Sequence, residues 1–356
     1  MKVALLAASL AASLSCHGQT RNEILLKKWD FSRDKVNWKQ VTVPHDWAID
    51  GPFDKKWDIQ YLAIVQDGQE RPIEHTARSG GLPWIGEGNY KTTFNIKKGT
   101  KHAQLYFDGA MSEPIVKVNG KEVGRWMYGY NAFRLNITPY IKDGENSVEV
   151  HLNNLEESSR WYPGAGLYRP VKLITTNESR IDEWETYFKT ISANHQKALL
   201  KVDTRIEDGN ALKNLTTKVE LLDAQGKQVV TGQQKINQQG AASFNLEVTN
   251  PHLWDIDTPY LYTLKTTLLK GKKAIDQTTT KVGIRTIDVS KEYGFRLNGK
   301  SLKFKGVCLH HDLGALGAAL NKTAVIRQIE MMKKMGVNAI RTSHNMPSQM
   351  QMDVCD

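Results

Sequence analysis

Two histidines close short apolar segments near the end of this chain, at positions where an enzyme could hold a ligand. His310 lies at the end of Leu302–His311, a segment of strand length and composition, and His344 ends a second such segment, Val337–His344. An imidazole ring can hydrogen-bond hydroxyl groups and fix their orientation. We therefore expect both histidines to contact a ligand, provided that the two predicted strands lie side by side.

A predicted helix between the two strands supplies that arrangement. The apolar spacing indicates a helix over Asn321–Met335, with a capping residue at its start and Gly336 at its end. Strand, helix, strand is a right-handed βαβ crossover, the repeating unit of a β/α barrel, whose chemistry lies at the carboxyl ends of the strands. A complete barrel needs ~250 residues. Residues 290–356 are therefore predicted to be the first βαβ unit of a truncated barrel.

Each candidate beside these strand ends also has a structural interpretation. His310 and His311 are adjacent, so their side chains point to opposite faces and one of them is expected to be structural. His311 or Asp312 could equally satisfy backbone groups where the strand meets the loop. Asp312 follows a strand end but has no carboxylate neighbour in sequence, and we do not assign it as a catalytic acid.

The rest of the chain is predicted to be mainly β, and it divides into two sandwiches. Residues 20–178 contain short strands separated by turn dipeptides such as Asn119-Gly120, which is typical of a jelly roll. Residues 180–287 contain six or seven more strands at regular spacing, which indicates an immunoglobulin-like sandwich. Seven of the nine tryptophans lie in the first of these regions: Trp29, Trp38, Trp47, Trp57, Trp84, Trp126 and Trp161. Core packing is expected to explain most of them, although sugar stacking also fits.

The N-terminus is predicted to be a secretory signal over residues 1–19, with a basic start at Lys2 and a short apolar run. Export to the periplasm or cell exterior follows, and Cys16 stands where a lipoprotein cysteine could stand. No other run approaches the ~20 apolar residues of a membrane span. Cys308 is expected to be buried in its strand as a small apolar residue.

Charge and motifs exclude several classes of protein. The chain has 48 basic and 38 acidic residues, a net charge of +10, but no Lys/Arg block of the kind that binds nucleic acid. No phosphate-binding glycine loop and no Cys/His spacing for zinc occurs.

Several stretches in register resemble glycoside hydrolase family 2, and within it the bacterial β-galactosidases. These stretches are VPHDWAIDGPF (Val43–Phe53), GGLPWIGEGNY (Gly80–Tyr90), FDGAMSEPIVKVNGKEVG (Phe107–Gly124), YGYNAFRLNIT (Tyr128–Thr138), SRWYPGAGLYRPV (Ser159–Val171), LWDIDTPYLYTL (Leu253–Leu264), FKGVCLHHDLGALG (Phe304–Gly317) and GVNAIRTSHNMPS (Gly336–Ser348). The family's architecture is a sugar-binding jelly roll, an immunoglobulin-like domain and a barrel. It agrees with the division reached from periodicity.

The resemblance implies a retaining glycosidase that cleaves terminal β-galactosides with two carboxylates ~5 Å apart. In the family both are glutamates on later barrel strands, which we expect beyond Asp356, so the chain as given should be inactive. It also implies that His310 and His344 contact the sugar, and that Asp46 reaches from the first domain to galactose hydroxyls. Arg341 could pair with the absent nucleophile and keep it ionised.

Alternatives to these roles stay open. Asp46 could be only an inter-domain hydrogen-bonding residue, and Arg341 a barrel-interior ion-pair residue. Arg160 and Trp161 occupy a loop that could also approach the sugar. A β-glucuronidase or β-mannosidase of the same family, or a non-catalytic carbohydrate-binding module, would fit much of the same sequence. The family often uses Mg²⁺ or Na⁺ and a homo-oligomer is compatible with it, but no residues here identify a metal site.

Overall fold

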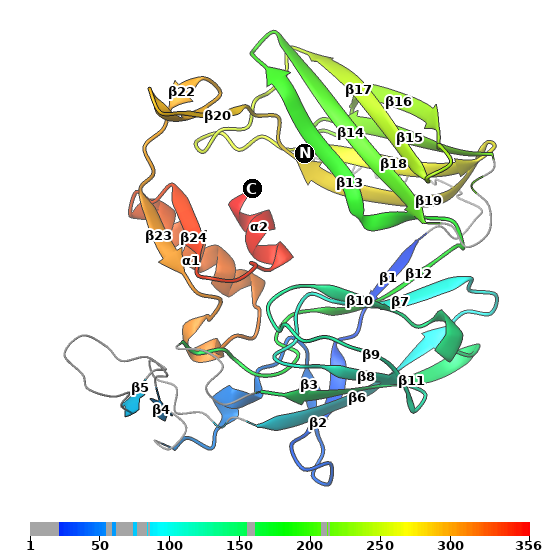
Figure 1. The fold of residues 1–356 in the computed structure, drawn as a ribbon, viewed down its shortest axis with the longest axis vertical. Coiled ribbons are helices and arrows are strands. Elements are labelled where there is room, and N and C mark those ends of the chain that lie inside the picture. The colour runs from blue at the N-terminus through cyan, green and yellow to red at the C-terminus, as the bar shows by residue number, and fades with distance from the viewer. Residues whose placement is uncertain are drawn as a thin grey trace, which may run out of the picture.

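The computed structural model describes residues 21–54, 59–61, 74–76, 84, 86–154, 161–207, 212 and 214–356. The predicted signal segment with Cys16 lies outside the described residues, as do Trp57 and Arg160. Figure 1 shows two β-sandwiches at opposite ends of the molecule, with a βαβ unit beside them. The predicted mainly-β fold, with two sandwiches followed by the start of a barrel, is confirmed.

The first sandwich packs a four-stranded sheet, in the order β1-β12-β7-β10, with a six-stranded sheet, in the order β3-β2-β6-β11-β8-β9. Its strands are β1 (Asn22–Leu25), β2 (Lys28–Ser32), β3 (Lys39–Thr42), β6 (Glu87–Ile96), β7 (His102–Phe107), β8 (Ile115–Val118), β9 (Lys121–Arg125), β10 (Phe133–Asn136), β11 (Gly144–Asn153) and β12 (Val171–Thr176). The β8–β9 turn has positive φ angles at both Asn119 and Gly120, as the predicted hairpin turn requires. Trp29 and Trp47 are fully buried in the core, as a packing role requires, whereas Trp126 is exposed.

The second sandwich pairs the sheets β13-β14-β17 and β16-β15-β18-β19. Its strands are β13 (Arg180–Ala193), β14 (Lys197–Glu207), β15 (Leu215–Leu222), β16 (Gln228–Lys235), β17 (Ala241–Thr249), β18 (Tyr262–Lys270) and β19 (Lys273–Val282). In β17 every second side chain is buried, from Ala242 through Phe244 to Val248, and the alternate side chains are exposed. This two-residue period places one face of the strand in the core and leaves the other in solvent.

The βαβ unit consists of β23 (Gly306–Leu309), α1 (Lys322–Lys334) and β24 (Ala339–Thr342), and α2 (Gln349–Cys355) follows it. The two strands pair in parallel, with Leu309 opposite Thr342. The side chain of Asn321 caps α1 by accepting from the N–H of Ala324, as predicted. Both strands are shorter than the sequence indicated, so the two site histidines follow the strands rather than end them.

The remaining elements are short. They are β4 (Ile59–Tyr61) and β5 (Glu74–Thr76), the antiparallel strands β20 (Ile287–Ser290), β21 (Gly294–Leu297) and β22 (Lys300–Ser301), and the 3₁₀ helices η1 (Trp47–Asp50), η3 (Thr138–Tyr140) and η4 (Gly314–Leu316). Of these, β20, β21 and β22 lie between the second sandwich and the βαβ unit. The strand predicted from Leu302 begins only at Gly306, as β23. The residues just before Leu302, Lys300–Ser301, form β22 and pair with β21. The domain boundaries proposed from the sequence stay predictions.

Candidate functional site

The carboxyl ends of β23 and β24 bring His310 and His344 together. Because the strands are parallel and in register, the residues that follow them leave the sheet at the same edge. The two imidazole rings lie 5.8 Å apart between centroids, almost perpendicular to each other. His310 is half-buried, and its Nδ1 is buried without a hydrogen-bond partner among the described residues, while His344 is exposed. The sequence-predicted pair is therefore one cluster in space.

Trp161 joins this cluster from the first sandwich. Its ring lies 5.3 Å from His310 and 5.7 Å from His344 between centroids. Its indole N–H donates to the hydroxyl of Tyr130 at 3.0 Å, which fixes the plane of the ring. We call Trp161, His310 and His344 the Trp161 cluster. An aromatic face beside two imidazoles offers an apolar stacking surface and polar groups for hydroxyls, which is the pairing that a sugar requires.

His311 points away from the cluster, as the alternation of side chains predicts. Its Nε2 lies 2.8 Å from the carbonyl oxygen of Pro163, and its ring packs edge-on against Tyr130 and Tyr168. Burial lowers the pKa of His311 to about 4, although the hydrogen bond to Pro163 opposes the shift. A buried neutral ring bonded to backbone is a structural group, whereas the ring of His310 faces Trp161 and His344.

Arg341 and Cys308 lie opposite each other on the paired strands. The Arg341 guanidinium lies 3.6 Å from the Cys308 sulfur and 3.3 Å from the Ser343 hydroxyl, and within the described chain it forms no ion pair. The prediction that Cys308 is buried is wrong, because its thiol is exposed on a strand face that no described residue covers. Hydrogen bonds from Ser343 and Arg341 lower the pKa of this thiol.

The surroundings of Asp46 favour one of its two predicted roles. Its carboxylate is completely buried and accepts four hydrogen bonds of 2.6–3.0 Å from protein donors. These donors are the hydroxyl of Tyr162 and the backbone N–H groups of Ala48, Ala165 and Ala318. Burial raises the pKa of Asp46, while the four hydrogen bonds oppose the shift. A carboxylate occupied in this way does not face a sugar, so the geometry favours the inter-domain alternative.

Sequence reasoning missed two contacts that shape the site, one made by Tyr128 and one made by Arg169. The Tyr128 hydroxyl donates to the side-chain oxygen of Asn345, directly after His344. Arg169 is buried in the first sandwich, and its guanidinium donates to the carbonyl oxygen of Met346 at 2.9 Å. No local sequence pattern predicts these contacts, because the partners lie 217 and 177 residues apart in the sequence.

The described carboxylates after residue 305 lie mostly away from this edge. Asp312 is the one described carboxylate that directly follows a barrel strand, whereas Glu330 lies in α1 and Asp353 in α2. A retaining glycosidase needs two carboxylates ~5 Å apart. The described residues also gather no group of three or more His, Cys, Asp or Glu side chains around a point where Mg²⁺ would fit.

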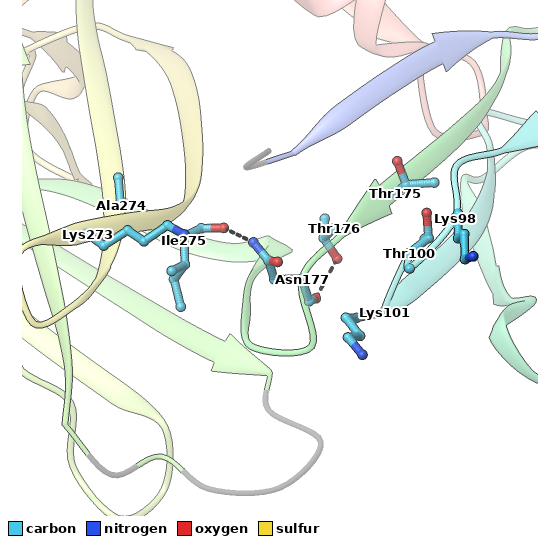
Figure 2. A pocket seen from close by; sticks show the side chains of 10 residues that line it. Lys98, Thr100, Lys101, Thr175, Thr176, Asn177, Lys273, Ala274 and Ile275 are labelled. Carbon is cyan, nitrogen blue, oxygen red and sulfur yellow. Dashed lines mark hydrogen bonds between the residues drawn. The ribbon is translucent and has the colours of Figure 1, made fainter. Parts of the chain in front are cut away.

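A cavity of about 190 Å³ lies between the two sandwiches, away from the ends of the barrel strands (Figure 2). It is lined by three lysines, Lys98, Lys101 and Lys273, together with threonines and Asn177. The Asn177 amide donates to the carbonyl oxygen of Ile275 at 2.5 Å and so links the two sandwiches. This cavity has no carboxylate in its lining and so cannot supply the pair of carboxylates that a retaining glycosidase uses.

Models of the glycosyl hydrolases family 2 match nearly all of the described chain. The sugar binding domain matches residues 23–177, the model named for the family as a whole matches residues 179–285, and the TIM barrel domain matches residues 287–356. The chain belongs to glycoside hydrolase family 2.

Individual relatives agree with this assignment. A β-galactosidase of Bacteroides ovatus is 38% identical over 90% of this chain, and a β-glucuronidase of Bacteroides fragilis is 29% identical over 98% of it. The crystal structure of a family 2 member from Bacteroides cellulosilyticus is 33% identical over 94% of this chain, with a TM-score of 0.80. The chain spans 37%, 50% and 46% of the lengths of these three proteins.

No helix among the described residues is long and apolar enough to cross a membrane.

Proposed function

We propose that this chain is the N-terminal part of an exported, retaining β-galactosidase. The observation that carries the proposal is the Trp161 cluster, which forms where the first sandwich meets the carboxyl ends of two barrel strands. Barrels of this kind place their active sites at this edge. The β-galactosidase of Bacteroides ovatus, with 38% identity, supports the choice of sugar.

Each member of the cluster has a role in this proposal. Trp161 stacks against the apolar face of the terminal sugar, and the half-buried His310 hydrogen-bonds its hydroxyls. His344, at the same edge, holds the sugar in its reacting orientation. Arg341 pairs with the catalytic nucleophile and keeps it ionised.

We propose further that residues 1–356 bind a galactoside without hydrolysing it. Hydrolysis with retention requires one carboxylate as nucleophile and a second as general acid and base. Asp312 has no second carboxylate after a barrel strand in the described chain. Sugar contacts alone orient the substrate but do not form the glycosyl–enzyme intermediate.

A second candidate is a β-glucuronidase of the same family. The observation in its favour is the β-glucuronidase of Bacteroides fragilis, which matches 98% of this chain. A glucuronide differs from a galactoside in the configuration of its C4 hydroxyl and in its C6 carboxylate, and the carboxylate needs a cation or several N–H donors in the site. Among the described residues, Arg341 is the exposed cation nearest in sequence to His344 of the Trp161 cluster.

The test compares three aryl glycosides, a β-galactoside, a β-glucuronide and a β-mannoside, with the protein encoded by the complete reading frame. A kcat/KM for the galactoside at least tenfold above the other two, with a product of retained anomeric configuration by NMR, supports the proposal. Higher activity on the glucuronide selects the second candidate. Residues 1–356 alone should show no turnover, and turnover by that chain would contradict the proposed inactivity.

Export is a separate proposal that rests on the apolar segment after Lys2. Cell fractionation of the native host should place the protein outside the cytoplasm. The wild-type protein and Cys16→Ser are each labelled with a fatty acid. Labelling that is lost in the variant would show a lipid anchor at Cys16, and labelling that is unchanged in the variant would argue against an anchor at this residue.

A further inference from the structure

Two loops follow the barrel strands, and each of them contacts a buried charged residue of the first sandwich. The first barrel loop, residues 310–321, begins with His310, and the second barrel loop, residues 343–348, contains His344. Asp46 contacts the first loop and Arg169 contacts the second. These charges are 0% and 2% exposed.

Asp46 joins three segments of backbone through one carboxylate. Its Oδ1 accepts from the N–H of Ala48, where it caps η1, and from the N–H of Ala165, both at 3.0 Å. Its Oδ2 accepts from the Tyr162 hydroxyl at 2.6 Å and from the N–H of Ala318 at 2.8 Å. Ala318 belongs to the first barrel loop, and Tyr162 directly follows Trp161. One side chain therefore ties the two segments that carry His310 and Trp161.

Arg169 makes the corresponding connection to the second loop. One nitrogen of its guanidinium, Nη1, donates to the carbonyl oxygens of Asp108 and Tyr130, at 3.2 and 2.8 Å within the first sandwich. The other, Nη2, donates to the carbonyl oxygen of Met346 at 2.9 Å. Asp108 also accepts from the N–H of Gln349, at the start of α2. The second loop is thereby fixed at Met346 and directly after its end, at Gln349.

The packing at the first contact leaves no room for displacement. A Cβ added to Gly317 would lie 2.5 Å from the carboxylate of Asp46 and 2.4 Å from Ile49. A Cβ added to Gly164 would lie 2.3 Å from the Cβ of Ala318. Distances below 3.0 Å are not tolerated without movement of the backbone. The contact is close-packed as well as hydrogen-bonded.

We propose that Asp46 and Arg169 are positioning residues, through which the first sandwich sets the places of His310 and His344. The proposal rests on the function proposed above. A buried charge is costly unless its hydrogen-bonding partners are fixed, so these side chains hold the backbone in one place. A displacement of ~1 Å at a reacting group can lower a rate about a hundredfold. Loss of either residue should therefore act on catalysis without removing any group that touches the sugar.

The first experiment uses the full-length enzyme with Arg169→Ala, Asp46→Asn and the control Arg134→Ala. Arg134 also joins segments far apart in the chain, β10 to β13, but it contacts neither barrel loop. We expect kcat on an aryl galactoside to fall roughly 10- to 100-fold in the first two variants, with a smaller change in KM. Arg134→Ala should keep its kcat within about twofold at a temperature where it is folded. Added guanidinium ion should restore part of the kcat of Arg169→Ala, because the ion can replace the lost donor.

Unchanged kcat in folded Arg169→Ala and Asp46→Asn would overturn the proposal, and so would an equal loss in Arg134→Ala. If Arg169→Ala does not fold, Arg169→Lys replaces it. Lysine keeps the charge but cannot reach three carbonyl oxygens with one rigid group, so the same loss is expected.

A second experiment separates this proposal from the proposed activity. NMR of residues 1–356 with ¹⁵N-labelled histidine reports the ring environments without any turnover. The His344 signals should change in Arg169→Ala and the His310 signals in Asp46→Asn, while both remain in place in Arg134→Ala. Unchanged histidine signals would refute positioning, even if the enzyme proved to be a galactosidase. A wild-type enzyme with no glycosidase activity would refute only the proposed function.

Discussion

At the scale of single residues, Trp161 is the side chain on which sugar recognition depends most. Both histidine rings lie within 6 Å of its own ring, and all three groups belong to different segments of the chain. The imidazoles fix hydroxyls, but only the indole offers a large apolar face. Stacking on Trp161 and hydrogen bonding by the two histidines can therefore be removed separately by substitution.

Trp161→Ala is expected to weaken galactoside binding by residues 1–356 several-fold, since an aromatic contact contributes about 0.5–1.5 kcal/mol. Calorimetric titration with a galactoside measures the change. Trp38→Ala is the matched control, because Trp38 is half-buried beside Lys91 on β6 and remote in sequence from the barrel. Equal affinity of both variants would show that the sugar does not stack on Trp161.

His311 gives a prediction for the pH dependence of stability. Burial lowers its pKa to about 4, from an ordinary value of 6.5. Between these values the unfolded state binds the proton more tightly, so stability is complete above pH 6.5 and falls as the pH drops toward 4. His311→Gln should flatten this part of the curve of Tm against pH.

The same variant should be less stable than the wild type at pH 8, by about 1 kcal/mol, through the lost hydrogen bond to Pro163. At pH 8 His311 is neutral in both the folded and the unfolded state, so the difference in stability between the two proteins at this pH reflects the lost hydrogen bond and not proton binding. A Tm curve of unchanged slope in His311→Gln would show that other groups carry the acid sensitivity. His45 and His102, whose pKa values burial also lowers to about 4, are then the next candidates.

At the scale of elements, the barrel strands are short and the loops after them carry the site. β23 and β24 each have four residues, and both histidines lie beyond them. Their positions therefore depend on how the loops are held. The first barrel loop is held by hydrogen bonds to Asp46 and by the close approach at Gly317.

Gly317→Ala is expected to destabilise the chain and weaken galactoside binding together. Gly336→Ala is its matched control, since both glycines have positive φ, 60° and 86°, but a Cβ at Gly336 meets no atom within 4 Å. The control should lose only the ~1 kcal/mol of an unfavourable backbone conformation. Chemical denaturation and sugar titration of both variants measure the difference. Identical losses in the two would show that the packing at Gly317 is dispensable.

At the scale of the whole molecule, a network of buried ion pairs joins the two sandwiches. Arg134 of β10 pairs with Asp182, Glu183 and Glu207, at 2.8, 3.0 and 3.3 Å, and Arg21 pairs with Glu183 and with Asp276. Burial would raise the pKa of Asp182, but the hydrogen bond and charge of Arg134 outweigh it and lower the pKa to about 2. The pKa of Glu183 is lowered in the same way against burial, mainly by Arg21.

This network predicts a second loss of stability in acid. Because the folded state keeps Asp182 and Glu183 ionised to lower pH, stability falls as the pH drops from about 4.5 toward about 2. Glu207 opposes this trend, since burial and its contact with Asp182 raise its pKa. Arg134→Gln should therefore move the midpoint of acid unfolding to higher pH.

Arg125→Gln is the control for this prediction. Arg125 forms an exposed ion pair with Glu122 at 2.7 Å on the first sandwich, and such pairs contribute about 0–1 kcal/mol. Circular dichroism during acid titration gives both midpoints. A midpoint that shifts equally in the two variants would mean that the buried network adds nothing specific.

The sequence by itself determined the order of the folds and the edge at which the site forms. Alternation with a period of two appears in segments such as Ala241–Thr249, and the helical spacing after Asn321 marks the crossover. These patterns are local, so they can be recognised from the sequence alone. They also placed His310 and His344 at one edge, because parallel strands end together.

Only the tertiary structure decided which side chains meet there. The sequence placed Trp161 in a loop that could approach the sugar and Arg169 in a stretch that resembles the family, but it gave the partners of neither side chain. Asp46 was expected at the sugar, yet it is buried against Ala318, 272 residues away. Contacts at such separations depend on how whole sandwiches pack against the barrel, and no local pattern encodes that packing.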